Sequence, residues 1–75
     1  MTIPLKTIMD MVKIIFPDKY ASLDFTYANT ANGETESHWE LYVAGEIKCK
    51  RFDSLLEVVE HLKTIYNGRR LEKAL

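Results

Sequence analysis

The chain has 75 residues, of which 47% are hydrophobic and 28% charged, a composition typical of one folded domain and too apolar for intrinsic disorder. Its longest apolar runs are about four residues, far below the roughly 20 that a membrane-spanning helix needs, so we expect no membrane association. A net charge of −1 argues against strong attraction of the whole chain to nucleic acid. We expect a cytoplasmic protein, because one cysteine forms no internal disulfide and Asp10 and Lys13 interrupt any apolar leader.

The charges are unevenly distributed along the chain. Residues 1–45 contain three lysines and six acidic residues, a net charge of −3, whereas residues 46–75 contain seven basic and five acidic residues, a net charge of +2. The basic residues of the second part fall in two groups: Lys48, Lys50 and Arg51, and then Arg69, Arg70 and Lys73.

The first predicted element is a helix that begins near Thr2 or Ile3, with Pro4 in its first turn. Pro17 forbids continuation, so the helix should end near Ile15 or Phe16. Its apolar residues recur at helical spacing and form one face: Leu5, Ile8, Met9, Val12, Ile15 and Phe16.

Three strands follow, as the alternation of apolar and polar residues indicates, at about residues 22–27, 37–42 and 46–52. A two-residue turn at the Asn-Gly pair of the first hairpin would place Phe25 beside Glu40 on one sheet face. A three-residue loop, residues 31–33 with Gly33 in the left-handed conformation, instead pairs Phe25 with Trp39. We therefore predict the three-residue loop.

The same reasoning predicts a loop of residues 43–45 in the second hairpin, again with its glycine third. That loop pairs Leu41 with Ile47 and Trp39 with Cys49, which puts Cys49 in the core. It also sets the polar pairs of the other face: Glu40 with Lys48, and His38 with Lys50.

The last predicted element is a helix capped by Asp53 or Ser54, where Ser54 and Glu57 fit a capping box. Asn67-Gly68 should close it. Its apolar stripe consists of Leu55, Val58, Val59, Leu62, Ile65 and Tyr66, which places His61 on the solvent side.

The fold class that follows is α+β. Residues 1–68 form a two-layer α-β-β-β-α domain with a three-stranded antiparallel sheet of order 1-2-3 and both helices on one face. Residues 69–75 form a polar C-terminal tail.

No group of residues predicts catalysis or ligand binding. His38 and His61 fall on different elements, Ser54 is used by the cap, and no phosphate-binding loop is present. Glu57 and His61 are four residues apart, a spacing that also suits an ordinary exposed helix pair. We therefore expect a protein that is not an enzyme and has no metal, cofactor or small-molecule substrate.

In its order of elements the chain resembles the double-stranded RNA-binding domain, over nearly its whole length. That family places lysines at the start of its last helix to hold phosphates. The matching positions here, Phe52 to Glu57, are acidic and apolar. The resemblance therefore implies the shape of that family without its phosphate contact at this helix.

The function expected from these features is that of a small accessory or adaptor domain that binds a protein, in the manner of short phage or mobile-element regulators. Two alternatives stay open: a weak RNA- or DNA-binding module, and a structural subunit that self-associates into a homo-oligomer. The candidate binding residues lie on the polar sheet face and in the basic groups: His38, Glu40, Tyr42, Lys48, Lys50, Arg51, Arg69 and Arg70.

Overall fold

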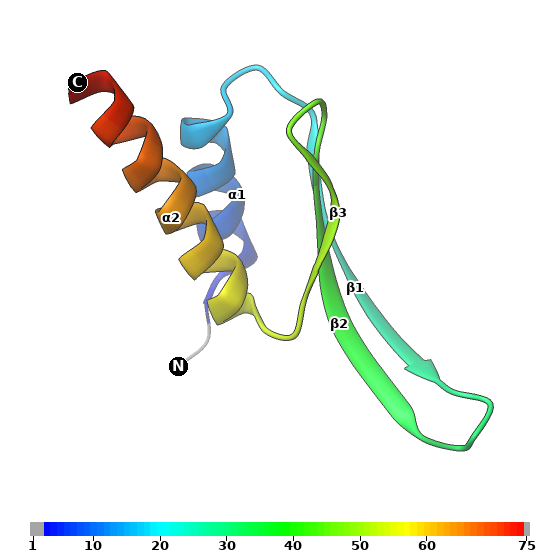
Figure 1. The fold of residues 1–75 in the computed structure, drawn as a ribbon. Helices are drawn as coiled ribbons and strands as arrows, with labels where there is room; N and C mark the ends of the chain where they lie inside the picture. The colour runs from blue at the N-terminus through cyan, green and yellow to red at the C-terminus, as the bar shows by residue number, and fades with distance from the viewer. Residues whose placement is uncertain (1–2, 75) are drawn as a thin grey trace.

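Figure 1 shows a computed structural model of the chain, which describes the backbone of residues 3–74 and the side chains of residues 3–69. Its elements are, in chain order, α1 (Leu5–Ile15), β1 (Ala21–Asn29), β2 (Thr35–Val43), β3 (Ile47–Phe52) and α2 (Leu55–Ala74). The strands form an antiparallel sheet of order β1-β2-β3, and both helices lie on one side of it (Figure 1). The predicted α-β-β-β-α architecture is confirmed.

Helix α1 ends where the sequence predicts. Phe16 donates its backbone N–H to the carbonyl of Val12 at 2.7 Å, and Pro17 stops the helix there. The start differs by a few residues: Pro4 is the N-cap and its carbonyl accepts the N–H of Thr7 at 3.1 Å, whereas Thr2 lies outside the described residues. The apolar stripe packs inward through Ile8, Val12, Ile15 and Phe16, all buried, while Leu5 is exposed.

The first hairpin has the predicted three-residue loop. Phe25 pairs with Trp39, and the closing pair is Thr30 and Glu34, whose backbone hydrogen bond is 2.7 Å long. Gly33 has φ +82°, the left-handed conformation that the loop requires.

The second hairpin differs from the prediction in both its loop and its register. Val43 pairs with Ile47, so the loop is residues 44–46, and Gly45 with φ +76° is its second residue. The carbonyl of Val43 accepts the N–H of Glu46 at 2.9 Å, a four-residue turn with a left-handed residue in third position that favours glycine.

Beyond this turn β3 has one extra residue relative to β2. The register passes from Val43–Ile47 to Leu41–Lys50, so that two residues of β3 oppose Tyr42. This is a β-bulge, and Cys49 within it has φ +47°. The bulge reverses the facing of the following residues, so Cys49 is exposed and the prediction of a core cysteine is wrong.

Helix α2 begins with the predicted capping box. The hydroxyl of Ser54 accepts the N–H of Glu57 at 3.3 Å, and the carboxylate of Glu57 accepts the N–H of Asp53 at 2.8 Å. The predicted end at Gly68 is wrong, because the helix continues to Ala74. Leu75 lies outside the described residues.

The core lies between the helices and one end of the sheet. Its fully buried large side chains come from all of the main layers: Ile8, Leu41, Leu62, Val43 and Val58. Trp39 is only partly buried at the edge of this core, and its pair Phe25 is 51% exposed. The reason is visible in Figure 1, where the β1–β2 hairpin extends well past the helices.

Candidate binding surfaces

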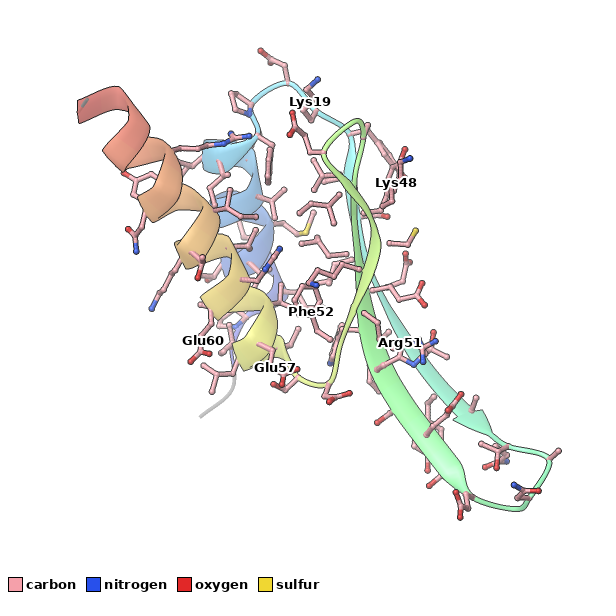
Figure 2. All side chains as sticks on the ribbon, in the orientation of Figure 1. Lys19, Lys48, Arg51, Phe52, Glu57 and Glu60 are labelled. Carbon is pink, nitrogen blue, oxygen red and sulfur yellow. The ribbon has the colours of Figure 1, made fainter. Side chains whose placement is uncertain are left out.

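The polar face of the sheet holds only part of the predicted binding set. Glu40 on β2 pairs with Arg51 on β3, so these opposite charges share the face away from the helices. Figure 2 shows Lys48 and Arg51 pointing away from the helices. Tyr42 also lies here, with its ring centroid 6.2 Å from that of Tyr20.

His38 has the expected facing but not the expected exposure. It pairs with Thr26, opposite in facing to Trp39, yet it is only 6% exposed. The Nε2 of His38 donates a hydrogen bond to the carboxylate of Glu40 at 3.1 Å. The prediction that His38 lies exposed on this face is therefore wrong.

Lys50 lies on the opposite face from the one predicted. The bulge at Cys49 pairs Lys50 with Leu41, whose side chain is fully buried on the helix side. The Nζ of Lys50 lies 5.7 Å from the ring centroid of Phe52, within range of a cation–π contact. Lys50 is thus separated from Lys48 and Arg51 by the sheet.

His61 also faces the sheet, contrary to the prediction that it points to solvent. Its ring centroid lies 5.4 Å from that of Phe52, which Figure 2 shows between β3 and α2. Burial, and secondly the positive charge of Lys50, lower the pKa of His61 below its ordinary value. Lys50 and Phe52 of β3 and His61 of α2 are therefore packed together.

Arg69 joins distant parts of the chain. Its guanidinium donates a hydrogen bond to the carbonyl of Ile15 and lies 4.5 Å from the ring centroid of Phe16, both at the end of α1. It also lies 3.5 Å from the carboxylate of Glu46 in the β2–β3 turn. The side chain of Arg70, the other predicted residue of this group, lies outside the described residues.

A cluster of aromatic residues that continues from the edge of the core along the β1–β2 hairpin is a surface the sequence reasoning did not single out. We call it the hairpin arm and define it by Phe25, Tyr27 and Trp39. Tyr27 is 69% exposed and Phe25 51%, and the ring centroids of Phe25 and Trp39 lie 4.7 Å apart. All three side chains have the same facing as the core residues Leu23 and Leu41, so one continuous apolar strip leaves the core and becomes exposed.

The observed element lengths help to explain the hairpin arm, whereas the shorter strand predicted from the sequence, residues 22–27, did not indicate it. A helix of 11 residues, such as α1, spans roughly 16 Å, whereas a strand of nine residues spans about 30 Å. The short first helix therefore cannot cover the full length of the strand that follows it.

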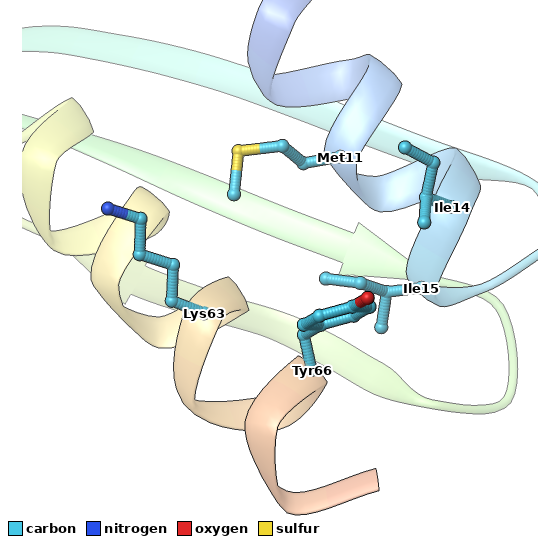
Figure 3. Close-up of a pocket in the computed structure, with 5 residues that line it drawn as sticks. All are labelled: Met11, Ile14, Ile15, Lys63 and Tyr66. Atoms are coloured by element: carbon cyan, nitrogen blue, oxygen red, sulfur yellow. The ribbon is translucent and has the colours of Figure 1, made fainter. Parts of the chain in front are cut away.

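A shallow apolar groove of about 220 Å³ lies between the two helices, on the side away from the sheet. Figure 3 shows the five residues that line it: Met11, Ile14, Ile15, Lys63 and Tyr66. Lys63 and Tyr66 supply the polar atoms at its rim, and Ile14 is 71% exposed. It has few convergent polar groups of the kind that fix the orientation of a small ligand.

The described residues contain no metal-binding cluster. Among the side chains of residues 3–69, no three of His, Cys, Asp or Glu gather in a way that would hold a metal ion. Glu57, one of the residues weighed for such a site, instead caps α2. In the same part of the chain, neither helix is both long enough and apolar enough to cross a membrane.

Comparison of the chain with protein-family models, with curated proteins and with solved structures finds no significant match.

Proposed function

We propose that this protein is a small non-catalytic accessory or adaptor domain that binds another protein, and that the hairpin arm is its binding surface. The observation that carries the proposal is the exposure of Phe25 and Tyr27 on the side of the sheet that elsewhere forms the core. Clustered exposed aromatic side chains favour a protein interface, because they bury much area with few rotatable bonds.

The arrangement of the basic residues favours a protein partner over nucleic acid. A phosphate backbone is bound by several cations that lie on one surface. Here Lys50 lies on the helix side of the sheet, Arg69 contacts the end of α1, and Arg51 lies opposite Glu40. The hairpin arm, by contrast, carries aromatic side chains without a cation.

The proposal includes a cytoplasmic location, of the kind expected for short phage or mobile-element regulators. Its single cysteine, Cys49, is exposed and unpaired with another cysteine, so folding requires no oxidising compartment.

Site-specific photo-crosslinking in the cells that naturally produce the protein tests the proposal. A photoreactive phenylalanine analogue replaces Tyr27 on the arm or, as a matched control, Tyr66, which is 46% exposed on α2. We expect position 27 to give a discrete protein adduct and position 66 to give much less. Equal adduct yields at the two positions, or none at position 27, would contradict the assignment of the hairpin arm.

A further inference from the structure

The two edges of the sheet are protected very differently. Strand β3 has a bulge and three basic residues, features that discourage pairing with another strand. Strand β1 is nine residues long, contains no lysine or proline, and keeps a continuous register with β2. Among the described residues no other strand pairs with its outer edge. Such an edge is open to pairing with another chain.

The backbone hydrogen bonds identify which groups of β1 point outward. Thr30 donates its N–H to Glu34, and the carbonyl of Tyr20 accepts the N–H of Ala44, so even-numbered residues at both ends of β1 bond toward β2 and its turn. In an antiparallel pair these bonds involve alternate residues. The odd-numbered residues of β1 therefore direct their N–H and C=O groups outward, and Phe25 stands at the centre of the strand.

We propose that a second copy of this chain binds here, by antiparallel pairing of β1 with β1 about a two-fold axis through Phe25. This inference rests on the proposed function and names the partner of the hairpin arm. The result is a continuous six-stranded sheet, with the helices of both copies on the same side. Such a symmetric contact is self-complementary, as two-fold dimer interfaces are.

The register centred on Phe25 is selected by three features. It pairs all nine residues of β1, with Ala21 opposite Asn29 of the partner copy at each end and Phe25 opposite Phe25 at the axis. In this register the two residues of every direct pair lie on the same face of the sheet. The outward N–H and C=O groups of the odd-numbered residues bond to those of the other copy. It also places Asp24, the single acidic residue of β1, opposite Thr26 of the partner copy, so the two Asp24 carboxylates do not face each other.

The pairing covers the exposed aromatic residues of β1. Tyr27 of each copy lies beside Leu23 of the other, and Leu23 is packed against the core. The rings of the two Phe25 residues meet at the axis. A net charge of −1 causes little electrostatic repulsion between two copies, which favours the dimer over the monomer.

Variants that introduce a positive or a negative charge at position 25 test whether a second copy binds and whether Phe25 lies at the axis. Sedimentation velocity of the purified full chain, over a wide range of concentration, should show the 8.7 kDa mass doubling. Phe25→Lys and Phe25→Glu should each raise the dissociation constant at least about tenfold, because like charges meet at the axis. An equimolar mixture of the two variants should dimerise again. Ile14→Lys, at an exposed apolar residue of α1, should leave the dimer intact.

A second variant keeps the test valid if the Phe25 variants unfold. Thr26→Lys puts an ammonium opposite Asp24 twice in the dimer, so it should tighten association, whereas Thr26→Asp should weaken it. A wild-type chain that stays monomeric at every concentration overturns the inference. Dimers that persist in both Phe25 variants, or a mixture that fails to re-form dimers, overturn this interface or its register.

The two proposals fail in different ways. If position 27 crosslinks to a different protein while the purified chain remains monomeric, the hairpin arm is a binding surface and only the second copy is wrong. If the chain is monomeric and position 27 gives no adduct, the proposed function fails as well.

Discussion

Arg69 holds three parts of the chain together through a single side chain. It binds the carbonyl at the end of α1, lies over the ring of Phe16, and approaches Glu46 in the β2–β3 turn. The carbonyl it reaches is one that a helix C-terminus leaves without an intrahelical partner. Arg69 directly follows Gly68, so a helix that passes through this glycine carries Arg69 on its last turns and gains these contacts.

Replacing Arg69 by methionine should lower the free energy of unfolding by about 1–3 kcal/mol, because the Ile15 carbonyl loses a charged donor. Lys63→Met on the exposed side of the same helix is the control and should change stability by less than about 0.5 kcal/mol. Urea unfolding followed by circular dichroism measures both. Equal effects of the two substitutions would show that Arg69 does not act as a clamp.

His61 should make stability depend on pH in a defined window. Burial, with a smaller effect from Lys50, lowers its pKa in the folded state, whereas in the unfolded chain the pKa stays at about 6.5. The unfolded chain therefore binds the proton more readily, so stability is complete above about pH 6.5. It falls as the pH drops below that value and levels off below the folded-state pKa.

His61→Gln isolates this contribution from those of the carboxylates. The free energy of unfolding of the wild type should fall more than that of the variant between about pH 7.5 and pH 5.5. Parallel pH profiles for the two proteins would place His61 in solvent, as its sequence position suggested.

At the level of elements, the bulge in β3 determines on which face of the sheet each basic side chain of this strand lies. Without it, Lys48 and Lys50 would share the polar face and Cys49 would enter the core. With it, Lys50 moves to the helix side beside Phe52, and Arg51 takes a place opposite Glu40. One inserted residue thus divides a basic run between two faces of the sheet.

Substitutions at Cys49 distinguish the bulge from a regular strand. A β-branched residue is strained at φ +47°, so Cys49→Val should destabilise the protein by about 1–2 kcal/mol. Cys49→Gly relieves the strain and should be neutral or stabilise by up to about 1 kcal/mol. Thermal or urea unfolding of the pair gives the ranking. A regular strand with a buried cysteine would give the reverse order, with valine tolerated and glycine costly.

The contrast between the two hairpins explains how far the sequence predicts the fold. In the first, the shared facing of Phe25 and Trp39 excludes the two-residue loop and favours the three-residue loop, which the structure has. In the second, a bulge offers another way to bring apolar residues to one face, since it pairs Phe52 with Trp39. Sequence alternation alone does not separate a shifted loop from a bulge, so the facings of Cys49 and Lys50 were predicted incorrectly.

At the level of the whole molecule, the helices and the sheet differ in length. The helices cover the end of the sheet near the β2–β3 turn, and the hairpin arm extends past them (Figure 1). The Cα extents of 51 × 29 × 21 Å reflect this elongation. The sequence correctly predicts the facing of Phe25 but not its exposure, because facing follows from alternation whereas burial depends on how far a neighbouring layer reaches.

Amide hydrogen exchange by NMR tests the central claim, that the outer edge of β1 pairs with a second copy. The outward N–H groups of Leu23, Phe25 and Tyr27 have no partner in the monomer, whereas those of Asp24 and Thr26 bond to β2. We predict that the outward amides exchange fast in dilute solution and become protected as the concentration rises, while the inward amides are protected throughout. Outward amides that exchange fast at every concentration would contradict the claim.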